Sequence, residues 1–577
     1  MQDVPFGGRC LVPGLAAGPV LYADVPLSFM GGVDVRTGEV IDTHHPLRGQ
    51  SVTGKVLVIP SGRGSCGGSA SLFEMIYGGT APAALVFKHK EPILALGSII
   101  ARELEQKSIP VVWLAESDHD TLARAAFALV EDGKVTAVSA MPALGSRVKS
   151  AAVALDLADV SLSSRDRRFL AGDFGEAGRV AMRIVIEAAQ LEGATELIDI
   201  DMAHIDGCFY QGPGSLAFAT KLADMGGAVQ VPSTMNAICV DRRQWRQQGV
   251  PASMGTPSDA LAEAYVRMGV QPTYTCAPYL LSPRPKAGQQ IGWAESNAVV
   301  FANAVLGART MKYPDYLDIC LALTGRAPNA DCHLDAPRLA TLRIDVPVKG
   351  PLDDAYYATL GYHLGKIATN EIPVLCGLEN SGATDDDLKA FGAAFATTSA
   401  APMFHVAGVT PEAPTVAAAI DATRPLRHIV VTVEELAETW RELNSAATAE
   451  VGLVALGNPH FSLTECEALA KLCQGRTKAP GVALIVTLGR EVYEAAKARG
   501  AVAEIERFGG SFVNDTCWCL IAEPVIPPGN GNIMTSSGKY AHYGTAAVGR
   551  GFHLRSLAEC VDAACKGHAS EAMPAWL

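Results

Sequence analysis

The sequence predicts an α/β protein with two parts: a small β/α domain at residues 1–145 and a larger region, 146–577, of parallel sheets covered by helices. Apolar strand-like segments alternate with amphipathic helical segments over most of the chain, which is typical of parallel sheets between helical layers. Polar residues gather directly after several strand-like runs, where parallel sheets collect their ligands. A chain of 577 residues corresponds to roughly two to four domains.

The small domain is predicted from short apolar runs bounded by Gly and Pro. Strands are expected in "VTGKVLVIP" (52–60), "APAALVFKH" (81–89) and "SIPVVWLAE" (108–116). The segments between them, 69–79 and 93–107, have the apolar spacing of helices. This pattern predicts a barrel-like or sandwich domain with helices, and "AMPALGSRVKSAAVALD" (140–156) reads as the linker that follows it.

The larger region begins with a predicted helix pair over residues 163–193, with a Ser/Asp-rich start. Strand-like runs then follow one another, separated by helical segments, up to the predicted terminal helix around "ECVDAACK" (559–566). Among the clearest runs are "EIPVLCGLE" (371–379), "VGLVALGNPHFSLTE" (451–465) and "VALIVTLG" (482–489). This alternation predicts parallel sheets with helices on their faces.

The composition excludes several functional classes. A net charge of −13 argues against a nucleic-acid groove, which needs a basic face. No apolar run approaches the length of a membrane span, and the N-terminal residues do not have the pattern of a signal peptide. The 14 cysteines are scattered without a compact CxxC array, so most are expected to be buried small hydrophobes. We expect a cytoplasmic protein without a membrane or nucleic-acid partner, as a monomer or small homo-oligomer.

The stretch "SGRGSCGGSA" (61–70) directly follows the apolar run "KVLVIP". Glycine lets a backbone approach a ligand closely, and serine, arginine and backbone N–H groups can hold a carboxylate or a phosphate. The alternative is a tight strand-to-helix turn in which the serines only cap the helix, Ser69 being the best placed.

Comparable polar clusters follow other predicted strands, and together they indicate one cavity. The clusters are "HIDGCFY" (204–210), "PSTMNA" (232–237), "TCAPY" (275–279), "CGLE" (376–379), "GNPHFS" (457–462) and "DTCWC" (515–519). Each could separately be a loop with a buried polar group. The segment "GNGNIMTSSGKYAHY" (529–543) is predicted to be a further glycine- and hydroxyl-rich loop that carries Lys539 and can hold an anion.

Three cysteines end strand-like runs: Cys276, Cys376 and Cys517. Three thiolates from separate strands can hold an iron–sulfur cluster and leave an iron open to a substrate oxygen. The alternative is that each is a core cysteine. Cys519 is left out of this set, because in an extended segment it would point away from Cys517. Cys332 is a weaker candidate ligand.

A buried helix is predicted at 295–310, opening with Glu295 and Ser296 and delivering Arg309 near its end. Arg309 could pair with an active-site carboxylate or cap its own helix. His405, in "MFHVAG", is expected to be structural.

With "GRGSCGGSASLFEMIYGG", "HIDG", "VPSTMNAI", "TYTCAPY", "ALGNPH" and "SSGKYAHY" in this order, the chain resembles aconitase X, a branch of the aconitase superfamily. The resemblance covers nearly the whole chain and implies that 1–145 is a swivelling domain. Archaeal members have two chains and dehydrate mevalonate 5-phosphate. Bacterial members are fused, small part first as here, and are associated with dehydration of cis-3-hydroxy-L-proline. Mevalonate 5-phosphate dehydration, or a non-catalytic ligand-binding role, are the alternatives.

The resemblance also implies roles for individual residues. Ser65 would be the base, and the swivelling domain would form one wall of a site between domains. Because two-chain members carry a cysteine where this chain has Asn458, the cofactor is expected to be a smaller cluster, [2Fe–2S], held by Cys276, Cys517 and, as first choice, Cys376. The residues expected to bind the hydroxyproline-like substrate are Arg63, Gly64, Gly207, Cys208, Phe209, Asn236 and Lys539.

Overall fold

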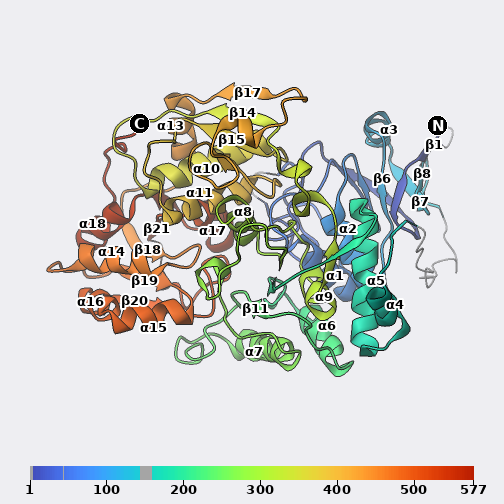
Figure 1. Ribbon diagram of the computed structural model, residues 1–577, viewed down its shortest axis with the longest axis horizontal. Coiled ribbons are helices and arrows are strands. Elements are labelled where there is room, and N and C mark those ends of the chain that lie inside the picture. The colour runs from blue at the N-terminus through green and yellow to red at the C-terminus, as the bar shows by residue number, and fades with distance from the viewer. Residues whose placement is uncertain (1–3, 43–44, 143–158, 530) are drawn as a thin grey trace. The chain divides into compact units, whose positions relative to one another are not determined.

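The computed structural model describes residues 4–42, 45–142, 159–529 and 531–577 (Figure 1). Its contacts divide the chain into two compact units. The first comprises Met1–Ser233, Glu263–Val270 and Tyr313–Ala330, and the second comprises Thr234–Ala262, Gln271–Lys312 and Asp331–Leu577. The expected boundary near residue 145, and most of the linker expected at 140–156, lie outside the described residues.

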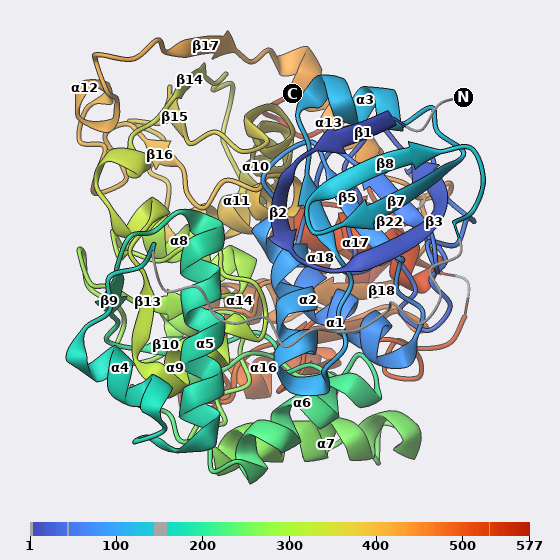
Figure 2. The ribbon, with the colours of Figure 1, turned by 90° about the vertical axis from the view of Figure 1, so that its right-hand side faces the viewer.

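An eight-stranded sheet forms the N-terminal part of the first unit, in the order β1-β8-β7-β3-β4-β5-β6-β2. Strands β3, β4, β5 and β6 run parallel to one another. Strands β7, β8 and β1 extend the sheet antiparallel beyond β3, and β2 pairs antiparallel with β6 at the other edge. Figure 2 shows that this sheet is strongly curved. The strands are β1 (Val4–Gly7), β2 (Arg9–Val12), β3 (Leu15–Tyr22), β4 (Val56–Ile59), β5 (Ala84–Phe87), β6 (Val111–Trp113), β7 (Phe127–Glu131) and β8 (Lys134–Val138).

Helices α1 and α2, which follow strands of this sheet, pack on helices from later in the first unit. Helix α2 packs on α5, and α1 packs on α6 (Figure 2). The predicted helix pair is confirmed as α4 and α5, and α4 starts with a capping box between Ser163 and Asp166. The elements are α1 (Gly68–Gly78), α2 (Pro92–Glu105), α3 (Glu116–Leu122), α4 (Ser164–Ala171), α5 (Gly175–Glu192), β9 (Leu197–Asp199), β10 (Ala203–Ile205), α6 (Pro213–Asp224), α9 (Leu317–Thr324) and β13 (Arg326–Pro328).

The second unit contains a four-stranded parallel sheet in the order β16-β15-β14-β17. Leu342 and Ile344 of β14 point into an apolar core that includes Leu360 and Phe391 from two of the helices. The elements are β14 (Leu342–Asp345), α10 (Asp354–Ala368), β15 (Pro373–Cys376), α11 (Asp385–Thr398), β16 (His405–Val406), α12 (Val416–Ala419), β17 (Arg427–Val430) and α13 (Val433–Glu442).

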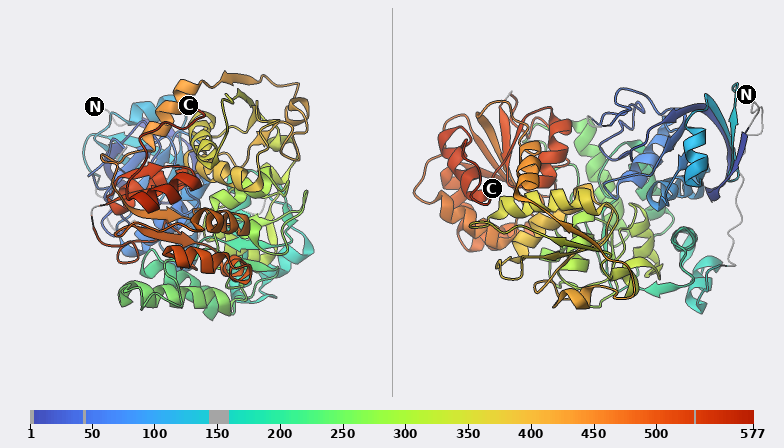
Figure 3. Two further views of the ribbon diagram at one scale, coloured as in Figure 1. Left: turned by 90° about the vertical axis from the view of Figure 1, so that its left-hand side faces the viewer. Right: turned by 90° about the horizontal axis from the view of Figure 1, so that it is seen from above.

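A five-stranded parallel sheet, β20-β19-β18-β21-β22, forms the C-terminal part of the second unit. Its central strand alternates: Val454 and Leu456 enter one apolar core, and Leu453 and Ala455 enter another. Helices therefore cover both faces (Figure 3). The elements are β18 (Val451–Leu456), α14 (Leu463–Cys473), β19 (Ala483–Thr487), α15 (Arg490–Ala498), α16 (Ala501–Phe508), β20 (Gly510–Val513), β21 (Asn532–Thr535), α17 (Gly538–Val548), β22 (Phe552–Leu554) and α18 (Leu557–Lys566).

Four further elements complete the description: β11 (Ser233–Met235), α7 (Ala252–Arg267), β12 (Gly292–Trp293) and α8 (Ser296–Ala304). The prediction of parallel sheets covered by helices is confirmed. The prediction of a loop at 529–543 is wrong, because the apolar residues of this segment form β21 and its hydroxyl-rich part starts α17. None of the described helices is long and apolar enough to cross a membrane.

Candidate functional site

The stretch 61–70 forms the turn between β4 and α1. Gly64 has a φ of 84°, a left-handed conformation that favours glycine. The Ser65 hydroxyl oxygen accepts a hydrogen bond from the N–H of Gly67 at 3.2 Å. Ser65 thus stands in the last turn before the helix, with its oxygen oriented by a backbone donor.

The expected capping role of Ser69 is wrong. Gly67 is the N-cap of α1, and it makes no side-chain capping bond. The buried Ser69 hydroxyl instead contacts two carbonyl oxygens, those of Cys66 at 3.2 Å and Asp315 at 3.0 Å. Ser69 therefore ties the start of α1 to the segment that precedes α9.

Arg63 lies on the exposed side of the same turn. Its guanidinium pairs with the carboxylate of Asp42. The hydrogen bond to the Ser65 oxygen comes from Gly67 rather than from Arg63.

The turn "HIDGCFY" follows β10 and is held from both sides. The Asp318 carboxylate accepts hydrogen bonds from the backbone N–H groups of Asp206 and, at 3.0 Å, of Gly207. The Tyr265 hydroxyl donates to the carbonyl of Gly207 at 2.8 Å. Burial raises the pKa of Asp318 to about 6, against the lowering effect of these N–H donors. The Gly207 N–H expected to bind substrate is therefore already used to hold the turn.

Phe209 brings this turn to the stretch that contains Ser65. A Cβ atom added to Gly67 would lie 3.3 Å from the Phe209 ring, which is close packing. Cys208, next to it, is fully buried, and its thiol donates to the carbonyl of Ile205. Two polar clusters that are far apart in the sequence thus meet within the first unit.

A second group of predicted residues lies in the second unit. Cys276 and Cys517 form a small buried cluster with Ala237, and Cys519 packs against it. The Cys517 thiol lies beside those of Cys276 and Cys519, and its pKa is raised well above the usual value, chiefly by the Cys276 thiol. The buried Asn236 adjoins this cluster, and its side-chain oxygen accepts from the N–H of Ala237 at 2.7 Å.

The expectation that Cys519 points away from Cys517 is wrong. Strand β20 ends at Val513, and residues 518–520 form a turn in which the Leu520 N–H donates to the Cys517 carbonyl at 2.9 Å. The alternation of an extended strand does not apply in a turn, so Cys519 lies beside Cys517. The thiol of Cys519 also accepts a hydrogen bond from the Asn458 side-chain amide at 3.2 Å.

Lys539 adjoins the three thiols from the first turn of α17. Its ammonium group donates to the carboxylate of Glu295, the N-cap residue of α8, at 2.9 Å. Burial lowers the pKa of Lys539, but Glu295 and the neighbouring thiols outweigh this effect and hold it well above its usual value. A permanent positive charge therefore stands next to Cys276, Cys517 and Cys519.

Family models match this chain along most of its length. They are the aconitase X swivel domain at 5–139, first domain at 159–336, second domain at 340–441 and third domain at 451–566. The chain belongs to the aconitase X family.

Individual relatives agree with this assignment. The chain is 52% identical over 570 residues to the cis-3-hydroxy-L-proline dehydratase of Pseudomonas aeruginosa, which covers 99% of this chain and 98% of the relative. It is 35% identical over 388 residues to the phosphomevalonate dehydratase large subunit of Methanothermobacter thermautotrophicus, which covers 67% of this chain and 94% of the relative. A crystal structure of Thermococcus kodakaraensis aconitase X in its holo-form superimposes with a TM-score of 0.64 at 31% identity and covers 70% of this chain and 100% of that one.

Cys376 lies elsewhere in this aconitase X chain. It ends β15 in the four-stranded sheet, in register with Asp345 of β14. Its charged neighbours are Arg343, Asp345 and Glu379, and burial raises the pKa of its thiol. The structure thus does not bring Cys376 to Cys276 and Cys517, and the cysteine that packs against those two is Cys519.

Substitution of Cys376 by serine tests this replacement. Because serine keeps a polar group beside Asp345, Cys376→Ser is expected to leave iron content, visible absorbance and activity at wild-type levels. Iron and acid-labile sulfide per chain are the measurement. A variant that folds but has lost its iron would restore Cys376 to the ligand set.

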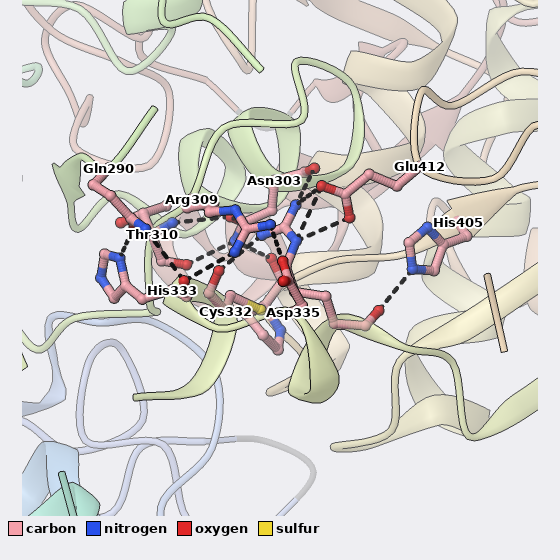
Figure 4. Close-up of polar contacts among 11 residues, drawn as sticks. Gln290, Asn303, Arg309, Thr310, Cys332, His333, Asp335, His405 and Glu412 are labelled. Atoms are coloured by element: carbon pink, nitrogen blue, oxygen red, sulfur yellow. Dashed lines mark hydrogen bonds and ion pairs between the residues drawn. The ribbon is translucent and has the colours of Figure 1, made fainter. Parts of the chain in front are cut away.

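Three other residues weighed from the sequence belong to a separate polar network, shown in Figure 4. Arg309 donates to the His333 carbonyl at 3.0 Å and pairs with the exposed carboxylate of Asp335. Cys332 is buried, and His405 donates to the Arg338 carbonyl at 2.8 Å. Arg338 in turn pairs with Glu412, and the network joins α8 to the four-stranded sheet.

The sequence indicates the polar turns themselves, but not the distant residues that hold them in place. Asp318 and Tyr265, which hold Gly207, come from elements about 110 and 60 residues away along the chain. Cys519 lies only two residues after Cys517, which indicates that the two thiols can be close together. The assumption of an extended strand places Cys519 on the wrong face.

Proposed function

We propose that this chain removes water from cis-3-hydroxy-L-proline and forms Δ1-pyrroline-2-carboxylate. The observation that carries the proposal is the similarity to the Pseudomonas aeruginosa dehydratase, 52% identity over 99% of this chain. The mevalonate-phosphate relative is less similar and covers only 67% of this chain.

The proposed cofactor is an iron–sulfur cluster held by Cys276, Cys517 and Cys519. Among the described residues, no group of three His, Cys, Asp or Glu side chains is arranged to hold a single metal ion. Three adjoining thiols are nevertheless the soft donor set that iron–sulfur clusters use. The neighbouring Cys276 thiol, together with burial, raises the pKa of Cys517. Because a raised pKa disfavours the thiolate, the thiolates need compensating positive charge. Irons and the Lys539 ammonium would supply it.

The small number of thiols favours [2Fe–2S] over a larger cluster. Asn458 stands where the two-chain branch of the family has a cysteine, and here its amide donates to the Cys519 sulfur. When bound, such a cluster supplies a Lewis acid for the departing hydroxyl group. A colourless, iron-free protein after anaerobic purification would contradict this part of the proposal.

Ser65 is proposed to take the proton from Cα of the substrate. The Cα–H electron pair becomes the Cα–C3 double bond, the C3–O bond breaks, and the hydroxyl leaves as water after protonation. The resulting enamine tautomerises to the cyclic imine without further catalysis. The N–H of Gly67 donates to the Ser65 oxygen, which favours its charged form.

The remaining predicted residues are assigned to substrate binding. Lys539 has ammonium protons beyond the one that Glu295 accepts, and these are proposed to hold the substrate carboxylate. Phe209 offers an apolar ring surface beside Gly67. Arg63, Gly64, Cys208 and Asn236 stay as proposed neighbours, and Gly207 is assigned to the shape of its turn. A cytoplasmic location and a monomer or small homo-oligomer remain predictions.

A substrate panel tests the proposed activity. Purified protein is incubated with the isomers of 3- and 4-hydroxyproline and with mevalonate 5-phosphate, and the pyrroline product is detected. We expect turnover of cis-3-hydroxy-L-proline and none of mevalonate 5-phosphate. A larger kcat/KM for mevalonate 5-phosphate would place the chain in the other functional branch.

A further inference from the structure

Helix α1 carries a buried carboxylate, Glu74, that serves another helix. Its two oxygens accept hydrogen bonds from the backbone N–H groups of Gly214 at 3.1 Å and Ser215 at 2.9 Å. The Ser215 hydroxyl donates to it as well, at 3.3 Å. These N–H groups belong to the first turn of α6, where helices leave their amides unpaired. Glu74 thus supplies the cap that the N-cap residue of α6, Gly212, cannot provide.

The surrounding glycines fit this carboxylate closely. A Cβ atom added to Gly212 would lie 2.3 Å from one Glu74 oxygen, and one added to Gly214 would lie 2.7 Å from the other. A side chain at either position would push the carboxylate away. The glycines are therefore matched to a carboxylate that arrives from a different part of the chain.

Two serines of α1 extend the connection. The Ser71 hydroxyl donates to the Gln211 side-chain oxygen at 2.8 Å, and the Ser69 hydroxyl contacts the Asp315 carbonyl. The first turn of α1 is thus joined to the residues just before α6 and just before α9.

The hydrogen bonds of Glu74 join the two helices that follow the proposed catalytic and substrate-binding turns. Helix α1 starts at Gly68, three residues after Ser65, and α6 starts at Pro213, four residues after Phe209. A carboxylate that joins the two helices sets the separation of the two segments that precede them. No proposed catalytic step uses Glu74 itself.

We propose that Glu74 is a positioning residue, which holds the Ser65 turn in register with the 206–212 turn. This inference rests on the proposed function. Misplacing a reacting group by about 1 Å costs on the order of 10²-fold in rate. Loss of the Glu74 bonds is therefore expected to lower kcat rather than to raise KM.

The test is a double-mutant cycle with Ser65. Glutamine has the shape of glutamate, but its NH₂ group cannot accept an N–H, so Glu74→Gln loses at least one of the two bonds from backbone N–H groups. We expect Glu74→Gln to lower kcat about 10- to 100-fold with little change in KM. In a Ser65→Ala background the same substitution should cost less than about twofold, because residues that act as a unit are not additive.

Two further variants complete the design. Gly214→Ala inserts a methyl group against the carboxylate without removing charge, and it is expected to lower kcat in the same way, which also covers the case that Glu74→Gln fails to fold. Glu103→Gln is the matched control, because Glu103 pairs with Arg183 between α2 and α5, away from the Ser65 turn. It should leave kcat unchanged.

The outcomes separate this inference from the proposed function. Wild-type kcat in folded Glu74→Gln and Gly214→Ala, equal losses with and without Ser65, or an equal loss in Glu103→Gln would each overturn the positioning role. A wild-type protein that does not dehydrate the hydroxyproline, or a fully active Ser65→Ala variant, would instead contradict the proposed function.

Discussion

Cys519→Ser is expected to remove visible absorbance, iron and dehydratase activity together. The reason is geometric: Cys276, Cys517 and Cys519 pack together, so each thiol would be one third of the proposed donor set. A hydroxyl at this position is a poor ligand for iron in place of a thiolate. Cys276→Ser and Cys517→Ser should behave alike. The measurements are the iron and sulfide content and the visible spectrum of anaerobically purified protein.

Substitution of a distant cysteine by serine is the matched control. Cys565 lies in α18, packed beside the core of the five-stranded sheet, and Cys565→Ser should retain iron. Circular dichroism separates loss of cluster from loss of fold. If Cys519→Ser keeps the full iron content while Cys517→Ser loses it, Cys519 is a neighbour of the cluster and another group is its third ligand.

Ser65→Ala is expected to lower kcat by about 10² to 10⁴-fold, the usual effect of losing a general base. Alanine removes only the oxygen that accepts the Gly67 N–H, so the turn, the thiols and substrate binding should persist. Exchange of the substrate Cα proton with deuterium from solvent reports the base directly. This exchange should disappear in Ser65→Ala even where the cluster is intact.

Ser69→Ala is the control four residues further along the chain. The Ser69 hydroxyl contacts two carbonyl oxygens and makes no capping bond, so its loss should cost about 0.5–1.5 kcal/mol of stability, the worth of a typical hydrogen bond, with modest kinetic change. Wild-type exchange of the Cα proton in Ser65→Ala would mean that another group is the base.

Patterns of short range were sufficient to predict most of the architecture. The run "KVLVIP" before "SGRGSCGG" predicts a buried strand, a glycine turn and a helix, and β4, the Ser65 turn and α1 follow in that order. The capping box at Ser163 is likewise a local signal. In contrast, "TCAPY" does not end a strand, because Tyr274 has a φ of 48° and the segment is irregular up to the short helical turn at Pro278.

The sequence by itself determined most of the elements, the parallel sheets and the two polar segments that carry Ser65 and Cys517. These follow from hydrophobic periodicity and from the conformational preferences of glycine and proline, which act over a few residues. Only the tertiary structure decided that Cys519 rather than Cys376 adjoins Cys276, and that Glu74 caps α6. Such contacts join residues tens to hundreds of positions apart, and their geometry depends on how turns direct side chains and on which helices pack together. No local pattern encodes that information.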